Sequence, residues 1–261
     1  MDMSGKRVLI TGSSSGIGFG IAEEFAKAGA KIMMHGLRKD HEAVEHLISI
    51  QKMSKSEVFY QSADIGKAEE CEALIEKTVE KLGGIDILVN NAGIQHVAKF
   101  EDFPKNKWDQ VISVNLSSVF HLSQAAIKYM NKENWGRIIN IASVHGLVAS
   151  KGKAAYVAAK HGLLGLTKVI ALEHAGSNVT CNAICPGWVL TPLVEKQIHA
   201  NAKEQGVSFD EAKKNLLLEK QPSGEFVKVE DLGKIAIFLA SEAAAQIKGV
   251  AMPVDGAWVS R

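Results

Sequence analysis

Short apolar runs of strand length recur along the chain, and longer stretches with helical spacing of apolar residues separate them. The clearest runs cover residues 8–10, 32–34, 85–89, 138–141 and 179–184. Because each run is apolar throughout instead of alternating with polar residues, we expect strands that are covered on both faces. Strands that alternate with helices predict parallel strands joined by crossover helices. The pattern therefore predicts an α/β fold with one doubly wound parallel sheet and helices on both faces.

One stretch interrupts this alternation before the last crossover helix. Residues 194–198 and 212–218 have the spacing of short amphipathic helices, within a segment that runs from about 191 to 226. The segment follows a strand end, and open α/β sheets bind ligands at the carboxyl ends of their strands. It predicts a helical lid over a substrate site. No linker, repeat or low-complexity segment divides the chain, so we expect a single domain over residues 1–261.

Composition narrows the class of protein. The 261 residues are 46% hydrophobic and 23% charged, which is typical of a globular protein with a large core. A formal net charge of +1 gives no basic surface for nucleic acid, and no apolar stretch is long enough to span a bilayer. No targeting pattern precedes the first apolar run, so we expect a cytoplasmic protein. Cys71, Cys181 and Cys185 lack zinc-ligand spacing, so we expect reduced buried thiols and no metal.

A glycine-rich segment follows the first apolar run and opens a helical stretch. Gly12, Gly16 and Gly18 would allow a tight turn, a close backbone approach, and a helix amino terminus that favours phosphate oxygens. The run 85–89 ends in the small residues Asn91, Ala92 and Gly93, which would let a cofactor ring approach the backbone. Either segment alone is also compatible with an ordinary turn.

Candidate catalytic residues lie further along the chain. Tyr156 and Lys160 are four positions apart and therefore share one helix face, where a cation would lower the pKa of a phenol from about 10. Such a pair is also common on protein surfaces. Ser143 follows the run 138–141 and would reach the same edge of the sheet, which favours a catalytic set. Asn115 lies within a helical stretch, where Asn is unfavourable without a functional reason.

These motifs together resemble the short-chain dehydrogenase/reductase family. The match consists of Thr-Gly-Ser-Ser-Ser-Gly-Ile-Gly from Thr11, Asn-Asn-Ala-Gly from Asn90, and Tyr-x-x-x-Lys from Tyr156. The resemblance implies a Rossmann-type fold and a catalytic set of Asn115, Ser143, Tyr156 and Lys160. Tyr156 would serve as general base, Ser143 would hold the substrate oxygen, and Lys160 would tune Tyr156 and bind the nicotinamide ribose. Asn115 would hold a water that links Lys160 to solvent.

The same resemblance implies the cofactor contacts, which are Gly12, Ser15, Gly16, Ile17, Gly18, Leu37, Asp64, Ile65, Asn91, Ala92, Gly93, Tyr156, Lys160, Pro186, Gly187, Val189 and Thr191. Asp64 would hold the adenine, although it could equally cap the helix that begins near Lys67. The segment 35–39 offers no acidic residue for a ribose 2′-hydroxyl, and Arg38 would suit a 2′-phosphate. Ser15 stands where phosphate-binding relatives often carry a basic residue. We predict NAD, with NADP as the alternative.

Four polar residues near these motifs predict a receptor for a small carboxylate. Gln95, His145, Lys153 and Gln197 offer two amides, a cation and an imidazole that could be cationic. Each one alone could be a solvated side chain. The strings that contain them run Asn-Asn-Ala-Gly-Ile-Gln-His from Asn90, Ile-Ala-Ser-Val-His-Gly-Leu-Val-Ala-Ser from Ile141, and Pro-Gly-Trp-Val-Leu-Thr-Pro-Leu-Val-Glu-Lys-Gln-Ile from Pro186.

These strings resemble the bacterial D-3-hydroxybutyrate dehydrogenases, a group within the family, and the likeness covers essentially the whole chain. It implies NAD-dependent reversible oxidation of D-3-hydroxybutyrate to acetoacetate, a reaction of ketone body metabolism. The four polar residues would bind the carboxylate, and Ser143 and Tyr156 would bind the reacting oxygen. Trp188 and Trp258 would line the methyl side of the substrate, and Trp258 could come from a neighbouring subunit. The resemblance also implies a homotetramer.

Three alternatives remain open at this point. An NADP-dependent 3-ketoacyl reductase would share Ser143, Tyr156 and Lys160 but would need an open mouth for a carrier-bound thioester. Another short-chain 3-hydroxy acid dehydrogenase would share the carboxylate receptor as well. A cofactor-sensing scaffold without activity could use the same fold. The polar residues and the lid argue against the first alternative, and the intact catalytic set argues against the third.

Overall fold

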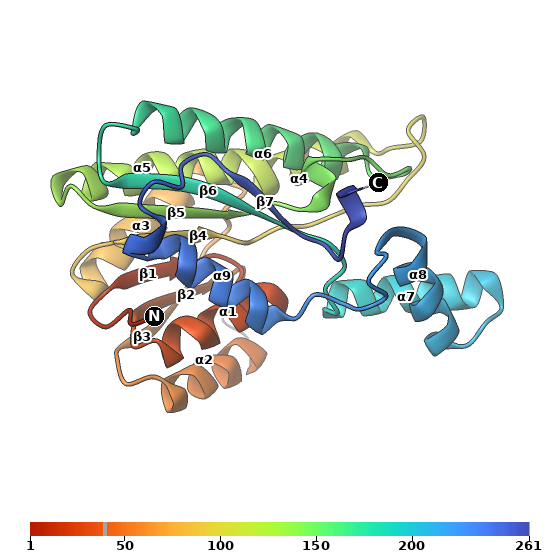
Figure 1. The fold of residues 1–261 in the computed structure, drawn as a ribbon, viewed down its shortest axis with the longest axis horizontal. Helices are drawn as coiled ribbons and strands as arrows, with labels where there is room; N and C mark the ends of the chain where they lie inside the picture. The colour runs from red at the N-terminus through yellow and green to blue at the C-terminus, as the bar shows by residue number, and fades with distance from the viewer. Residues whose placement is uncertain (39–40, 261) are drawn as a thin grey trace.

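Seven parallel strands form one sheet, which confirms the predicted doubly wound α/β fold (Figure 1). The computed structural model describes residues 1–38 and 41–260. The order of the strands across the sheet is β3-β2-β1-β4-β5-β6-β7. The strands are β1 Arg7–Ile10, β2 Lys31–Gly36, β3 Val58–Ser62, β4 Ile87–Asn90, β5 Gly136–Ile141, β6 Val179–Pro186 and β7 Ala251–Val254.

Helices cover both faces of the sheet. They are α1 Gly16–Lys27, α2 His41–Met53, α3 Ala68–Leu82, α4 Lys105–Ile112, α5 Ser118–Lys132, α6 Ala154–Glu173, α7 Pro192–Gln205, α8 Phe209–Lys220 and α9 Val229–Ala240, with short turns η1 Ser113–Ser117, η2 Val144–Gly146, η3 Glu242–Ala244 and η4 Trp258–Ser260. Val8 and Ile10 pack toward α1, α2 and α9, whereas Leu9 packs toward α3, α5 and α6. Successive residues of β1 thus enter two separate apolar layers, as expected for strands buried on both faces.

The order of the strands places a crevice between β1 and β4. After β1 the chain moves outward to β2 and β3 and then returns to the other side of β1, so the connections that leave β1 and β4 diverge. Ile10 pairs with Val89, which brings the turn after β1 directly beside the turn after β4. A Cβ at Gly12 would lie 2.8 Å from Ala92 Cα. This reversal at the carboxyl edge of the sheet is where doubly wound folds bind ligands.

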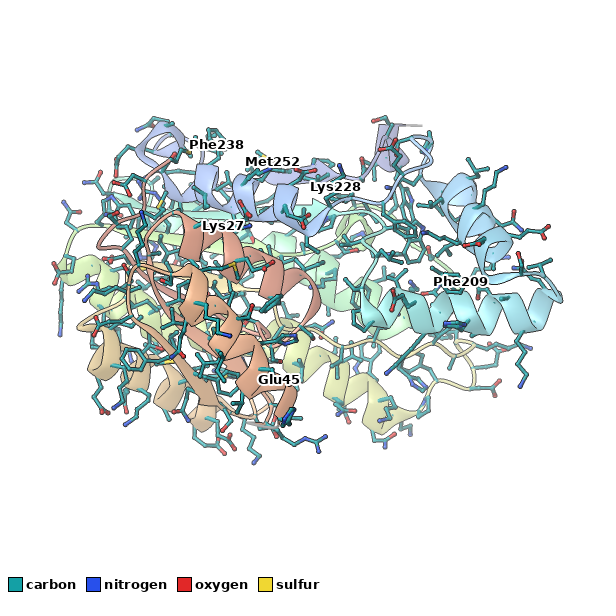
Figure 2. All side chains as sticks on the ribbon, turned by 90° about the horizontal axis from the view of Figure 1, so that it is seen from below. Lys27, Glu45, Phe209, Lys228, Phe238 and Met252 are labelled. Carbon is teal, nitrogen blue, oxygen red and sulfur yellow. The ribbon has the colours of Figure 1, made fainter. Side chains whose placement is uncertain are left out.

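The two helices of the predicted lid are present, and they are longer than the sequence pattern indicated. They are α7 and α8, which Figure 1 shows in light blue beyond the sheet and Figure 2 shows on the side of the molecule marked by Phe209. Thr191 caps α7 and Ser208 caps α8, each accepting a backbone N–H, which explains why both helices begin earlier than expected. The apolar faces of both helices pack in one cluster with Trp188 and Trp258.

One further prediction, that of buried free thiols, can be compared with the structure. Cys71, Cys181 and Cys185 are free and buried, as expected. Within residues 1–38 and 41–260, no helix is long and apolar enough to cross a membrane. The same residues contain no group of His, Cys, Asp or Glu that could hold a metal ion.

Candidate active site

A long groove of about 460 Å³ runs along the carboxyl edge of the sheet, across the crevice between β1 and β4. Of the residues predicted to contact the cofactor, it is lined by Gly12, Ser15, Gly16, Ile17, Leu37, Asp64, Ile65, Asn91, Ala92, Gly93, Tyr156, Lys160 and Thr191. Their roles as cofactor contacts stay predictions. Sequence reasoning did not identify the remaining lining residues, which are Ser14, His35, Gly36, Ala63, Ile94, Gln110, Val114, Ile141, Ala142 and Pro192.

Predicted contact Gly18 lies outside the lining of the groove and has a packing role instead. A Cβ at this position would lie 2.3 Å from Asn91 Nδ2, which itself donates to the carbonyls of Thr11 and Gly12 at 2.9 and 3.1 Å. The Asn91 amide therefore ties the turn after β4 to the turn after β1. Gly18 is required so that this amide can lie against α1.

The amino terminus of α1 faces the groove with its N–H groups uncapped. Ser15 precedes the helix without making a side-chain capping bond, and the first turn contains no acidic residue. Gly12 and Gly16 have φ of 62° and 56°, values that glycine adopts without strain. Free N–H groups and the positive end of a helix dipole suit the pyrophosphate of a dinucleotide. The residues present therefore fit the cofactor that the motif predicts.

His35 is a groove residue that the sequence motifs did not reveal. Its ring joins two neighbouring segments, because Nδ1 accepts the Gly12 N–H at 3.2 Å and Nε2 donates to the Ala63 carbonyl at 3.1 Å. Burial lowers the pKa of His35 to about 4, so the ring is neutral. Asp64 beside it lines the groove and also accepts the Gly66 N–H at 3.1 Å. Its carboxylate does not cap α3, which begins at Ala68 without a side-chain capping bond, so the alternative role as a helix cap was wrong, and its contact with the adenine stays a prediction.

The catalytic candidates meet where the long groove joins a smaller inner cavity of about 110 Å³. Tyr156 lines both spaces, Lys160 lines the groove and Ser143 lines the inner cavity. Lys160 Nζ lies 5.6 Å from the centre of the Tyr156 ring and donates to the carbonyl of Ile141 at 2.7 Å. The structure thus places all three predicted residues at one point of the carboxyl edge.

The expected depression of the Tyr156 pKa is absent. Burial raises the pKa of Tyr156, and a hydrogen bond with Ser143 only partly opposes this shift. Burial also lowers the pKa of Lys160 to about 8, so this side chain holds its charge less firmly than a surface lysine. Desolvation is the largest cause of the shift in the Tyr156 pKa, and the charge of Lys160 is not among its causes. Tyr156 is protonated in the free chain at neutral pH.

Asn115 lies in the π-helical turn η1 between α4 and α5, rather than in an ordinary helix. Its side chain accepts the N–H of Ile94 and donates to the carbonyl of the same residue, both at 2.9 Å. These two bonds fix the backbone just before Gln95, a residue of the inner cavity. The side chain therefore positions the segment after β4, and its predicted link to Lys160 through a water stays a prediction.

The inner cavity collects most of the residues predicted for the substrate. Gln95, Ser143, His145, Lys153, Tyr156, Trp188 and Trp258 line it together with Pro186, Gly187, Val189 and Thr191 from the predicted cofactor set. Ile17 of the predicted cofactor set also lines it, as do Ala142, Val144 and Val194, which were not predicted. Gln197 is the exception, since it lies on α7 outside this lining. Its Oε1 is buried and has no hydrogen-bond partner in the part of the chain that the structure describes.

Lys153 provides a buried cation at the inner cavity. Its residue exposure is 7%, and burial lowers its pKa. Its Nζ lies 5.1 Å from the centre of the Trp188 ring. Among the described residues Lys153 forms no ion pair. A desolvated ammonium without a carboxylate partner is a strong binding point for an anion.

His145 differs from the expected cationic imidazole. Burial, followed by the charge of Lys153, lowers the pKa of His145 to about 4, so the ring is neutral at physiological pH. Its ring centre lies 5.9 Å from that of Tyr156 and 5.6 Å from that of Trp258. The aromatic contact continues to Trp188, whose ring centre is 5.5 Å from that of Trp258. His145 is therefore part of an aromatic wall, and Lys153 is the cation of the inner cavity.

Comparison with known proteins places this arrangement in context. The model of a family described as short chain dehydrogenase matches residues 6–202. The D-beta-hydroxybutyrate dehydrogenase of Cupriavidus necator is 53% identical over 99% of this chain and 100% of its own, and that of Rhizobium meliloti is 49% identical over 98% and 99%. A crystal structure of a putative 2-deoxy-d-gluconate 3-dehydrogenase from Agrobacterium tumefaciens with bound NADP superposes with a TM-score of 0.87, at 32% identity over 100% of this chain and 98% of that chain.

Proposed function

Because the chain belongs to the short-chain dehydrogenase/reductase family, we propose that it catalyses the reversible oxidation of D-3-hydroxybutyrate to acetoacetate with NAD. The protein is an oxidoreductase that uses a nicotinamide cofactor. The observation that carries the choice of substrate is the inner cavity, in which Lys153 lies near Ser143 and Tyr156 and has no acidic partner among the described residues. A small hydroxy acid has the carboxylate and the nearby hydroxyl that these groups require.

The residues of the site divide the work of the reaction. When bound in the long groove, the nicotinamide cofactor supplies the acceptor or donor of the hydride. Tyr156 takes the proton of the substrate hydroxyl during oxidation and returns it during reduction. The Ser143 hydroxyl holds the substrate oxygen beside Tyr156, and Lys153 holds the carboxylate. Lys160 contributes a donor at the junction of groove and cavity, fixed by its bond to the Ile141 carbonyl.

Because its pKa is raised, Tyr156 begins reduction in its protonated form but must lose a proton before oxidation. A protonated phenol is ready to donate to a ketone oxygen, so reduction begins from the state that dominates at neutral pH. Oxidation requires the phenol to lose its proton first. We therefore expect the enzyme to favour reduction at lower pH and oxidation at higher pH.

The choice of NAD rests on the residues at the end of β2. His35, Gly36 and Leu37 line the groove there, and none of them carries a positive charge, because burial lowers the pKa of His35 to about 4. Ser15 before α1 is also uncharged. A 2′-phosphate would need a cation at this place, and Arg38 is the candidate that would supply it. NAD therefore fits the groove lining, and NADP use would require Arg38 to turn toward the groove.

An assay of initial rates tests the proposal. The absorbance of reduced nicotinamide is followed with D- and L-3-hydroxybutyrate, each with NAD and with NADP. We expect the highest kcat/KM for the D enantiomer with NAD. A preference for NADP with a 3-ketoacyl thioester would favour the ketoacyl reductase instead, and the absence of turnover with any of these pairs would contradict the proposal.

The assembly and location are parts of the same proposal. We propose a homotetramer, supported by apolar side chains that face outward on α5 and α6, namely Phe120, Val169 and Leu172. We also propose that the protein works in the cytosol, where its three free thiols would stay reduced. Light scattering tests the first statement, since the mass of a single 28.1 kDa chain in solution would contradict it.

A further inference from the structure

The side-chain amide of Gln221 joins the end of the lid to the segment that carries Trp188. Gln221 directly follows α8 and is only 1% exposed. Its Oε1 accepts the backbone N–H of Trp188 at 2.8 Å, and its Nε2 donates to the carbonyl of Glu225. A backbone N–H can only donate and a carbonyl can only accept, so these partners fix which end of the amide is the oxygen. Both ends of the buried amide therefore have a defined partner.

The backbone of Trp188 is held on both sides by the segment that follows the lid. Its N–H donates to Gln221, and its carbonyl accepts the N–H of Val227 at 2.9 Å. The next residue, Val189, forms a parallel bridge with Val227. Trp188 therefore takes its position from residues 221–227, which lead from the lid to α9.

Two glycines leave the space in which the Gln221 side chain lies. A Cβ at Gly187 would lie 2.5 Å from Gln221 Oε1, and a Cβ at Gly256 would lie 2.7 Å from Gln221 Cγ. Gly187 follows β6 and Gly256 follows β7, so the side chain is enclosed by the ends of both strands. Gly256 also belongs to the turn that leads to Trp258. Both tryptophans of the inner cavity are thus attached to segments that pack against Gln221.

The position of Trp188 limits the size of the inner cavity. Its side chain lines this space of about 110 Å³ together with Trp258. The outer side of the ring packs against apolar side chains of α7 and α8. A substrate with a longer alkyl group would need the Trp188 ring to move outward. The backbone bonds to Gln221 and Val227 oppose that movement.

We propose that Gln221 is a positioning residue that holds the backbone of Trp188 and thereby makes the inner cavity selective for a four-carbon 3-hydroxy acid over longer ones. This inference rests on the proposed function, in which such an acid occupies the cavity. Gln221 lies outside the cavity lining and acts through Trp188. Ser143 and Tyr156 are carried by other segments, the end of β5 and α6, so loss of Gln221 should change the fit of the alkyl group more than the proton transfer.

The preference for chain length tests the proposal. Gln221→Met keeps the length of the side chain and removes both hydrogen bonds. We expect the ratio of kcat/KM for D-3-hydroxybutyrate to that for D-3-hydroxypentanoate to fall about tenfold, since an apolar pocket discriminates one methylene by about 10- to 200-fold. The kcat for D-3-hydroxybutyrate should stay within about threefold of wild type. If Gln221→Met does not fold, Gln221→Asn takes its place, because its shorter amide cannot reach both partners.

Asn182 provides a matched control. Its side chain is also 1% exposed and makes the same pair of bonds, donating from Nδ2 to the Ile247 carbonyl at 2.7 Å and accepting the Val250 N–H at Oδ1 at 3.0 Å. It lies on β6, outside the lining of the inner cavity. Asn182→Leu should lose similar stability in urea denaturation but keep the wild-type ratio of kcat/KM values. An equal fall of that ratio in both variants would overturn the proposal, because general destabilisation would then be its cause.

Exchange of the Trp188 backbone amide with solvent is a readout that needs no substrate. In protein isotopically labelled at tryptophan, the backbone NMR signal that disappears in Trp188→Phe should exchange at least about tenfold faster in Gln221→Met than in wild type, because the N–H loses its acceptor. An unchanged exchange rate or an unchanged ratio of kcat/KM values in the Gln221 variant would contradict the inference. If the wild type does not oxidise 3-hydroxybutyrate, the proposed function fails, while the exchange rate still decides whether Gln221 holds Trp188.

Discussion

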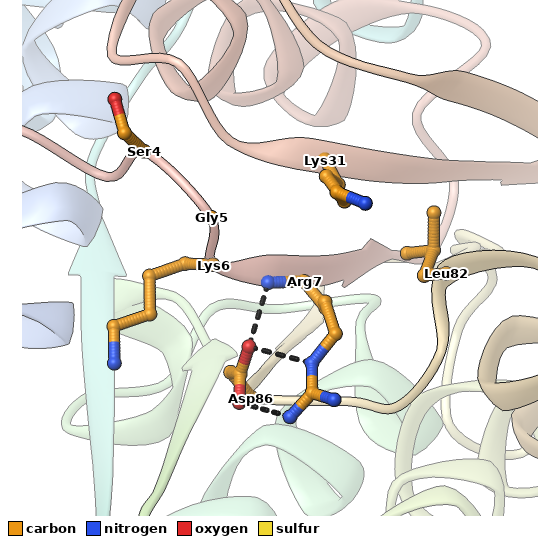
Figure 3. Close-up of a pocket in the computed structure, with 7 residues that line it drawn as sticks. All are labelled: Ser4, Gly5, Lys6, Arg7, Lys31, Leu82 and Asp86. Carbon is orange, nitrogen blue, oxygen red and sulfur yellow. Dashed lines mark hydrogen bonds and ion pairs between the residues drawn. The ribbon is translucent and has the colours of Figure 1, made fainter.

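The sheet carries a cavity at each of its two edges, and the two differ in how their charged residues are paired. At the amino edge, where the strands begin, a cavity of about 520 Å³ is lined by Ser4, Gly5, Lys6, Arg7, Lys31, Leu82 and Asp86 (Figure 3). This space is larger than the inner cavity at the carboxyl edge, and it also contains three basic residues. Size and charge alone would therefore mark the amino edge as the better candidate for a site.

The ion pairs and ring contacts of the basic residues make the amino edge the poorer candidate. Arg7 holds Asp86 through two side-chain bonds of 2.8 and 2.7 Å and one backbone bond, as Figure 3 shows, and Lys31 pairs with Glu57 at 2.6 Å. Lys6 lies over the Trp135 ring. At the carboxyl edge, by contrast, Lys153 is buried and has no carboxylate partner within residues 1–38 and 41–260. A basic residue that forms an ion pair within the protein contributes to the fold, whereas a buried cation that forms no ion pair is available to bind an anionic ligand.

The largest effect is expected at the carboxyl edge from Tyr156→Phe. Loss of the hydroxyl removes the group that exchanges the substrate proton, so kcat should fall roughly 10³-fold or more. Cofactor affinity, measured by fluorescence titration, should change little because the ring remains. Substantial turnover by this variant would show that another residue handles the proton.

A change at Lys153 tests the idea of the unpaired cation directly. Lys153→Met keeps the bulk but removes the charge-assisted bond to the carboxylate, so KM for the hydroxy acid should rise about 30- to 100-fold. The control is Lys151→Met, which alters an exposed lysine two positions away in the same loop. Equal effects of the two substitutions would remove Lys153 from the site.

The pH dependence should show the protonated phenol. Because burial raises the pKa of Tyr156, kcat/KM for oxidation should climb about tenfold per pH unit up to that pKa, while the contribution of the protonated phenol to reduction should stay constant over this range and be lost only above the pKa. The His145 pKa of about 4 predicts no ionisation of this residue between about pH 5 and 8. A His145→Gln variant should therefore keep the shape of the profile, and loss of a limb near neutrality would contradict the neutral ring.

The smallest effect on turnover is expected at the amino edge. Asp86→Ala leaves the half-buried Arg7 without its partner and should lower the free energy of unfolding by about 2 kcal/mol, with kcat within about twofold of wild type. Urea denaturation measures the first quantity. Glu57→Ala, which breaks an exposed pair, should cost less than about 1 kcal/mol. A large loss of activity in Asp86→Ala would mean that the two edges are coupled.

The sequence predicted those parts of the fold in which each strand is buried on both faces. β1, β2, β4, β5 and β6 have continuous apolar runs, whereas β7 ends the sheet and β3 at the other margin is only partly buried. Neither margin strand stands out as an apolar run, because an edge strand buries less of its surface. The bounds of α7 and α8 were too short, since caps at Thr191 and Ser208 extend both helices beyond the apolar pattern.

Motifs predicted which residues gather at the site but not their electrostatic state. The positions of Ser143, Tyr156 and Lys160 follow from local spacing along β5 and α6. The protonation of Tyr156 and His145 depends on burial by Trp188, Trp258 and the lid, which are distant in sequence. The sequence did not predict the place of His35 in the groove, because the two groups that its ring contacts come from the turns after β1 and β3. The spacing of residues along the chain predicts which side chains lie close together. Their desolvation, which shifts their pKa values, depends on the packing of the whole fold.

The paired indoles of the inner cavity also have an optical consequence. Trp188 and Trp258 are two of the four tryptophans, and their ring centres lie 5.5 Å apart. At this separation their electronic transitions couple, so the near-ultraviolet circular dichroism of the protein should contain a signal that neither ring gives alone. Trp108 in α4 and Trp135 at the amino edge lie outside this pair and would contribute a constant background. The two indoles are thus an intrinsic optical probe, because their coupled spectrum depends on the angle between the segment after β6 and the end of the chain.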